Sequence, residues 1–154
     1  MQSFRRGWSA DKGPVKGRFS PRNPKRYVGN PANIIYRSLW ERRAMEYFDN
    51  HPDVLNWGSE EIIVPYVSPI DNKLHRYFPD FWARIRQSNN NIIEFLIEVK
   101  PKAQTMPPVA RTRTRRYITE VLQFGVNEAK WKAAYEMCQR KGWKFMILTE
   151  DELG

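Results

Sequence analysis

Two carboxylates and a lysine near the middle of the chain have a spacing that suits catalysis. The stretch from Phe78 to Lys100 reads F-P-D-F-W-A-R-I-R-Q-S-N-N-N-I-I-E-F-L-I-E-V-K. Two alternating apolar runs flank its polar cluster, a pattern typical of an antiparallel hairpin. A turn centred on Asn89 places Asp80 opposite Glu98. Because side chains alternate along a strand, Asp80, Glu98 and Lys100 then lie on one face.

This register has an independent check in the charges that it brings together. Arg84 falls opposite Glu94, and opposite charges directly across a ladder are favourable. A slip of one residue would turn one of the two site carboxylates to the other face, so the geometry is a hypothesis. The same register also predicts the pairs Ile85–Ile93 and Trp82–Leu96.

Two facing carboxylates with a lysine form a set suited to phosphodiester hydrolysis. The carboxylates repel each other unless a cation sits between them. Mg²⁺ prefers such oxygen ligands, polarises a phosphate and lowers the pKa of a bound water. A neighbouring ammonium orients that water and offsets charge that develops on the phosphate. The sequence therefore predicts a site for a divalent metal and a charged oxygen substrate.

A third carboxylate comes from a helix that we expect over residues 33–49, between two prolines. On this helix Glu41 falls inside an apolar arc that includes Ile34 and Phe48. A charge facing the interior is costly unless it is compensated. Glu41 therefore either forms an ion pair with Arg37 or joins the metal site, where it supplies the third carboxylate that two metals would require.

Composition predicts one domain whose positive charge is concentrated in two segments. The 154 residues carry a net charge of +9. Residues 1–30 have eight Lys or Arg against one Asp, and residues 100–116 have six against no acid. Concentrated positive charge suits a polyanion such as nucleic acid, the alternative being a solubilising tail. Neither segment has the amphipathic basic helix of a membrane-binding protein.

Cysteine content and the N-terminus exclude other classes. The single cysteine, Cys138, rules out a disulfide framework and a Cys-based zinc site, and it fits a small buried hydrophobe. There is no apolar signal region and no run of membrane-spanning length. These features fit a reducing cytoplasm.

The remaining segments complete an αβββαβ order: a mixed α/β sheet flanked by helices. We expect residues 1–30 to be a flexible arm that lies along DNA or docks on a protein, and 31–154 to be the folded domain. A turn is expected at residues 56–58, followed by strands over 60–67, 74–86 and 143–148. A helix is expected over 117–141, with Trp131, Ala134, Tyr135 and Cys138 as its apolar stripe. The basic loop 100–116 either contacts phosphates or is simply solvated.

Four further polar residues have a plainer reading beside the functional one. Glu60 and Glu61 could reach the site, but a solvated strand start is favoured. His75 has no nearby His or Cys partner and reads as a surface residue. Lys130 is either a solvated helix lysine or a group that faces substrate.

Short motifs resemble known nucleases. Pro79-Asp80 followed by Glu98-Val99-Lys100 resembles the P-D…E-x-K signature of the restriction-endonuclease-like, or PD-(D/E)xK, superfamily. The string S-L-W-E, which ends at Glu41, resembles a helix of phage junction-resolving endonucleases and of the transposon-end endonuclease subunit. Longer strings, among them I-I-Y-R-S-L-W-E-R, H-R-Y-F-P-D-F and E-V-K-P-K, resemble the head completion nucleases of tailed phages.

The resemblance implies specific roles. Asp80, Glu98, Glu41 and the backbone carbonyl of Val99 would bind Mg²⁺, with Mn²⁺ as a substitute, and Lys100 would serve the water. The protein would be a double-strand DNA endonuclease that completes phage heads, in the host cytoplasm and at the head–neck region, beside portal or neck proteins. The alternatives are a structural DNA-end-binding protein with a dispensable nuclease site, and a junction-resolving endonuclease. The residues expected to contact DNA are Arg18, Arg22, Lys25, Arg26, Lys102, Arg111, Arg113, Arg115, Arg116 and Lys130.

Overall fold

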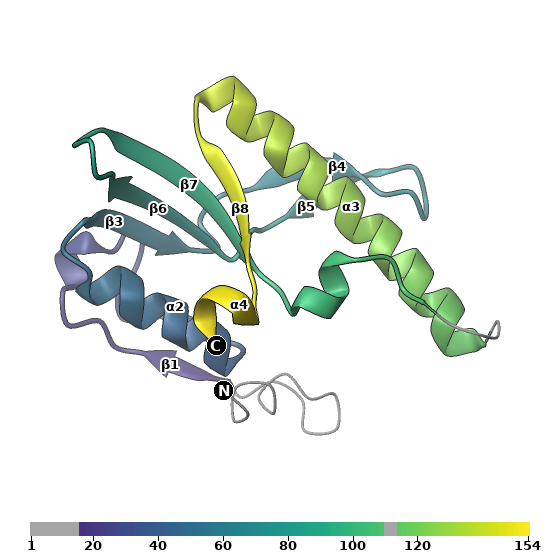
Figure 1. Cartoon of the computed structure of the whole chain (residues 1–154), viewed down its shortest axis with the longest axis horizontal. Coiled ribbons are helices and arrows are strands. Elements are labelled where there is room, and N and C mark those ends of the chain that lie inside the picture. The colour runs from purple at the N-terminus through teal and green to yellow at the C-terminus, as the bar shows by residue number, and fades with distance from the viewer. Residues whose placement is uncertain (1–15, 110–113) are drawn as a thin grey trace.

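A four-stranded mixed sheet between two helices forms the body of the protein. The computed structural model describes residues 16–109 and 114–154. The sheet has the order β3-β6-β7-β8, from β3 (Val54–Ser59), β6 (Phe81–Arg86), β7 (Ile92–Val99) and β8 (Lys144–Leu148). β3, β6 and β7 are antiparallel, and β8 runs parallel to β7. Helix α2 (Leu39–Asn50) and helix α3 (Arg115–Lys141) cover opposite faces (Figure 1). The chain order α2-β3-β6-β7-α3-β8 confirms the predicted αβββαβ class.

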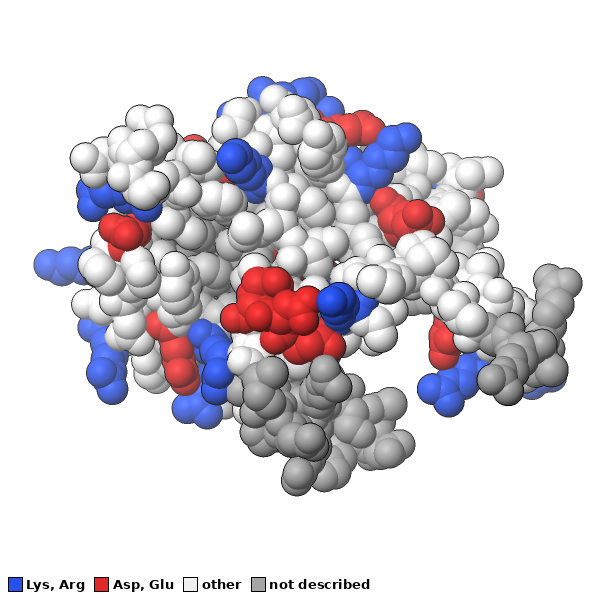
Figure 2. All heavy atoms as spheres, viewed as in Figure 1, with Lys and Arg blue, Asp and Glu red and all other residues white. Residues whose placement is uncertain are grey.

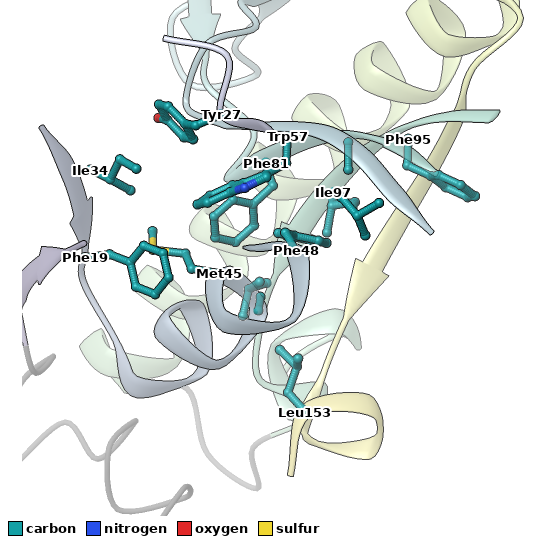
Figure 3. Packing of buried hydrophobic residues seen from close by; sticks show 14 of the residues in the cluster. Phe19, Tyr27, Ile34, Met45, Phe48, Trp57, Phe81, Phe95, Ile97 and Leu153 are labelled. Carbon is teal, nitrogen blue, oxygen red and sulfur yellow. The ribbon is translucent and has the colours of Figure 1, made fainter. Parts of the chain in front are cut away.

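Each face of the sheet has its own apolar core, because side chains alternate along β7. Phe95, Ile97 and Val99 pack in the core on the α2 side, whereas Leu96 belongs to the core that contains Ala134 and Cys138 of α3. In the α2 core, aromatic rings pack edge to face, with 5.2 Å between the ring centroids of Phe48 and Phe81 (Figure 3). Cys138 is fully buried, as predicted.

The central hairpin has the predicted register. Ile85 pairs with Ile93, Arg84 with Glu94 and Trp82 with Leu96. The side chains of the charged pair bond elsewhere: Glu94 accepts a hydrogen bond from Trp82 Nε1 at 3.1 Å, and Arg84 donates to Asn56 at 3.3 Å. The polar turn is closed by Gln87 N donating to the carbonyl of Asn91 at 2.7 Å.

The prediction of a flexible arm is wrong for residues 16–30, which are part of the fold; residues 1–15 lie outside the described residues. β1 (Gly17–Phe19) pairs with β2 (Ile34–Tyr36), and a short 3-10 helix spans Pro24–Arg26. Phe19 and Tyr27 are buried against Trp57, with centroid distances of 5.9 and 4.7 Å. The buried carboxylate of Asp49 accepts the backbone N–H groups of Arg22 and Asn23. The rings of Phe19 and Tyr27 and the carboxylate of Asp49 therefore hold residues 16–30 against the rest of the domain.

Two predicted boundaries on either side of β3 are also wrong. α2 begins at Leu39 rather than Asn33, because the β-branched residues before it form β2 and Ser38 caps the helix by accepting Glu41 N–H at 3.1 Å. The first sheet strand is β3, which contains residues predicted as a turn. The strand predicted over 60–67 is only β4 (Val64–Val67), which pairs with β5 (Leu74–Tyr77) as a separate hairpin that packs on α3. The single strand predicted over 74–86 is in fact two strands, β5 and β6, which belong to different sheets.

The C-terminal part agrees with the predicted helix and strand. Gly142 ends α3 with the left-handed φ of 73° that glycine allows. Ala134 and Cys138 are buried as predicted, but Tyr135 is 55% exposed and lies outside the stripe. α4 (Glu150–Leu153) follows β8, and Figure 2 shows acidic side chains gathered over it. Within the described residues, no helix is long and apolar enough to cross a membrane.

Candidate active site

Asp80 and Glu98 meet where the central hairpin opens toward α3. Asp80 immediately precedes β6, and Glu98 is the penultimate residue of β7. The ladder ends at the pair Phe81–Ile97, one step before these acids, and Val99 N–H donates to Asp80 Oδ2 at 2.7 Å. The predicted placement of the two acids at neighbouring strand ends is therefore present.

Nearby positive charge does not fully compensate the negative charges of Asp80 and Glu98. Burial, followed by the negative charges of Glu98 and Glu41, raises the pKa of Asp80 well above its usual value, against the Val99 N–H bond and Lys100. Burial also raises the pKa of Glu98, although the Tyr77 hydroxyl, Lys100 and Lys130 act in the opposite direction. Paired buried acids of this kind fit a cation, because it would stabilise both ionised forms.

Glu41 approaches the same place from the other layer. Its Oε1 accepts the backbone N–H of Arg37 at 3.0 Å, and burial raises the pKa of its carboxyl, with further contributions from Glu60 and Glu98. The Arg37 guanidinium does not form the alternative pair with Glu41; it binds Glu60 Oε1 at 2.6 Å. Glu41 belongs to α2, whereas Glu98 points to the α3 side.

The arrangement of these acids limits which side chains could bind one metal ion together. In the described part of the chain, no three His, Cys, Asp or Glu side chains are grouped so that they could hold one ion. Asp80 and Glu98 supply carboxylate oxygens, which are the hard donors that Mg²⁺ prefers. The charge of Glu41 acts on Asp80, and that of Glu98 acts on Glu41.

Two lysines lie at the acids. Lys100 directly follows β7, and its Nζ is 3.8 Å from Glu98 Oε2. Lys130 comes from α3, and its Nζ lies 5.6 Å from the ring centroid of Tyr77 and 5.8 Å from that of Tyr66. Burial and the neighbouring Lys100 lower the pKa of Lys130. Among the described residues predicted to contact DNA, Lys130 is the one whose positive charge acts on Glu98.

The other basic residues predicted to contact DNA are spread over the molecule. The guanidinium of Arg26 donates to the carbonyls of Asp49 and His51, so it serves the fold. Lys102 forms an ion pair with Asp151 at 3.0 Å, beside the acidic α4. The remaining residues are exposed on β1, near the 3-10 helix or at the start of α3, apart from two outside the described residues. The exposed group is Arg18, Arg22, Lys25, Arg115 and Arg116; the two outside are Arg111 and Arg113.

Sequence reasoning missed one group at the site and undervalued another. Tyr77 donates its hydroxyl to Glu98 Oε1 at 2.7 Å. Burial and Glu98 raise the pKa of Tyr77, so its hydroxyl remains a donor. Glu60, favoured as a solvated residue, has a positive φ of 57° and donates its N–H to the carbonyl of Asp80 at 3.1 Å. Only the position of Tyr77 three residues before Asp80 could have drawn attention to it. His75 is exposed and bonds Asp71, as expected of a surface residue.

Comparison with known proteins identifies the family of the chain. Residues 51–150 match the family described as TnsA-like endonuclease N terminal. The chain belongs to the TnsA-like endonuclease family. The matched segment contains Asp80, Glu98, Lys100 and Lys130, whereas Glu41 lies before it. The chain is also 40% identical over 142 residues to the head completion nuclease of Enterobacteria phage T4, covering 89% of this chain and 92% of that protein. The predicted resemblance to head completion nucleases is confirmed.

Proposed function

We propose that this chain hydrolyses DNA phosphodiester bonds with the help of a divalent cation during completion of a phage head. The pair of acids, half-buried Asp80 and buried Glu98, with Lys100 beside them, is the observation that supports cleavage best. The relative in phage T4 is named a head completion nuclease, and the similarity extends over most of both chains. On this proposal the protein works in the infected host cell, at the neck of the filled head, next to portal or neck proteins.

The cation would be held by Asp80, Glu98 and the carbonyl of Val99. All three supply oxygen, which suits Mg²⁺ and allows Mn²⁺ to replace it. Bound there, the metal would polarise the scissile phosphate and make a water ligand more acidic. Membership of an endonuclease family supports this chemistry, and the P-D…E-x-K residues are the ones that the proposal uses.

The protein's own groups complete the proposed reaction. The Lys100 ammonium, 3.8 Å from Glu98, orients the attacking water and offsets negative charge on the phosphate as it builds. Lys130 approaches from α3 and contacts the substrate phosphate. Glu41 supplies a third negative charge from α2. Arginines at the start of α3 and the exposed basic residues of the N-terminal segment hold the duplex by its phosphates.

A cleavage assay tests the proposal. Supercoiled plasmid and linear duplex are incubated with the full-length protein in Mg²⁺ or in EDTA, and nicking is followed on gels. We expect cleavage in Mg²⁺ only, reduced at least about 100-fold in both Asp80→Ala and Glu98→Ala. Asp71→Ala is the matched control, because Asp71 lies in an exposed turn and bonds only local groups. Cleavage that persists in EDTA, or in both site variants, would refute the metal site.

The Asp80→Ala variant also separates cleavage from a structural role in the head. A phage whose copy of this gene carries Asp80→Ala should give particles with unfinished heads and few plaques if hydrolysis is required. Normal yields of infectious particles, together with no cleavage in the gel assay, would favour the DNA-end-binding role instead.

A further inference from the structure

The β4–β5 hairpin contributes a buried tyrosine to the site from outside the main sheet. Tyr77 is the last residue of β5, is 5% exposed and pairs with Val64 of β4. Its hydroxyl donates to Glu98 Oε1 at 2.7 Å. The same ring lies beneath Lys130 of α3, with 5.6 Å between Nζ and the ring centroid. Tyr77 therefore interacts both with Glu98 of the site and with Lys130 of α3.

This contact fixes how Glu98 presents its oxygens. A glutamate side chain has several rotatable bonds, and holding one conformer in the interior needs partners. Tyr77 takes Oε1, and Oε2 is the oxygen that lies 3.8 Å from Lys100 Nζ. Val99 N–H fixes the facing Asp80 in a similar way, through Oδ2. Each acid thus accepts a hydrogen bond on one oxygen, and among the described residues no hydrogen bond to its second oxygen is seen.

We propose that Tyr77 is a positioning residue: its hydroxyl holds Glu98 in the conformer that presents Oε2 to a divalent cation and to Lys100. The inference rests on the proposed nuclease function. Partners that orient a ligating side chain commonly influence metal affinity and rate although they do not touch the metal. The role belongs to the hydroxyl group, because phenylalanine would keep the ring, the packing of the hairpin on α3 and the contact with Lys130.

The variant Tyr77→Phe isolates that hydroxyl. We expect its maximal cleavage rate to fall about 10–100-fold and its affinity for Mn²⁺ to weaken by about tenfold. The KM for duplex DNA should stay within about twofold of the wild-type value, because the phosphate-binding residues are unchanged. Mn²⁺ binding is measured without DNA, from the electron paramagnetic resonance signal of free Mn²⁺, so that it does not depend on turnover.

Tyr27→Phe is the matched control. Tyr27 is another buried tyrosine, and its hydroxyl accepts the backbone N–H of Ser59 at 3.2 Å. Losing this hydroxyl should lower the melting temperature while leaving Mn²⁺ affinity and cleavage rate unchanged. The comparison separates the general cost of losing a buried hydrogen bond from an effect on Glu98.

Two results would overturn the role of Tyr77. One is a Tyr77→Phe protein that binds Mn²⁺ and cleaves DNA as the wild type does. The other is an equal loss of both properties in Tyr27→Phe, which would make the effect a matter of stability alone. Failure of the nuclease proposal would look different: the wild type would not cleave in any cation, and the Mn²⁺ titration would still decide whether Tyr77 positions Glu98.

Discussion

Replacing Asp80 by asparagine should make the metal-free protein more stable while removing its activity. Asparagine has nearly the same shape, and its side-chain oxygen can accept the Val99 N–H bond that Asp80 Oδ2 accepts at 2.7 Å. What the change removes is a negative charge that burial, Glu98 and Glu41 all disfavour. The folded state gains from this loss, whereas the unfolded chain, with its acids in water, is little affected.

The size of the gain follows from the charges around the site. Two like charges about 6 Å apart repel by about 3 kcal/mol at an effective dielectric constant of about 20. Lys100 attracts Asp80, so part of this repulsion is already offset in the wild type. We therefore expect the free energy of unfolding to rise by about 1–2 kcal/mol. At about 2–4 °C per kcal/mol for a domain of this size, the melting temperature should rise by about 2–8 °C.

The pH dependence has a definite sign. At a pH below the ordinary Asp value of 3.8, Asp80 is protonated in both states, so wild type and variant should be equally stable. As pH rises from there, the unfolded chain ionises first while the raised pKa of Asp80 keeps its proton in the folded protein. Wild-type stability therefore falls relative to the variant until the pH exceeds the raised pKa of Asp80, and the difference is largest above that value.

The measurement is thermal unfolding by circular dichroism, in EDTA and in Mg²⁺. At 100 times its dissociation constant, Mg²⁺ should stabilise the wild type by about 2.7 kcal/mol and leave Asp80→Asn unchanged. Asp71→Asn serves as the control with the opposite sign, because the Lys73 N–H and His75 lower the pKa of Asp71. A lower melting temperature for Asp80→Asn in EDTA at neutral pH would refute the account of the site as two acids whose negative charge is only partly compensated.

Three further predictions concern the lysine, the N-terminal segment and DNA affinity. Lys100→Ala should reduce cleavage about 100- to 1,000-fold, with the Kd for duplex DNA in Ca²⁺ unchanged within about threefold in a gel-shift assay; an equal loss of binding would make Lys100 a phosphate anchor instead. Asp49→Ala should lower the free energy of unfolding in urea by about 2 kcal/mol or more, because two backbone N–H groups lose their acceptor; a change under about 0.5 kcal/mol would mean that this clamp contributes little. Replacing Arg18, Arg22 and Lys25 by alanine should flatten the slope of log Kd against log salt concentration by up to about 2.7, because up to three phosphate contacts are lost. An unchanged slope would exclude this surface from DNA binding.

The central hairpin could be predicted from sequence because its determinants are local. Alternation between Phe81 and Arg86 and between Ile92 and Val99, with an asparagine-rich turn between them, is enough to set the register. Once the register is set, the positions of Asp80 and Glu98 follow from the twofold period of a strand. The same reasoning predicted the burial of Ala134 and Cys138 on α3, but not the exposure of Tyr135.

The predictions from sequence were wrong, or incomplete, where tertiary contacts determine the local structure. The segment before Pro31 is rich in Gly, Pro and basic residues, so its composition suggests an arm, but Phe19 and Tyr27 fasten it to Trp57. The string N-W-G reads as a turn, yet it lies in β3, where Trp57 is fully buried among other aromatic rings. Tyr77 reaches Glu98 only because β4 and β5 fold onto α3, which no local pattern near Tyr77 could predict.

The location of the site in the core on the α3 side of the sheet explains which side chains surround it. The face of β7 toward α2 is apolar as far as Val99, but on the α3 face the apolar Leu96 is followed by Glu98 and then Lys100. Carboxylates in such a place are destabilising unless neighbours compensate them. Tyr77 and Lys130 compensate Glu98 in part, and the raised pKa shows that the compensation is incomplete. If that remaining deficit is what a bound cation supplies, then affinity for metal and intrinsic stability are coupled here: a substitution that relieves the buried charge strengthens the fold and weakens the metal site.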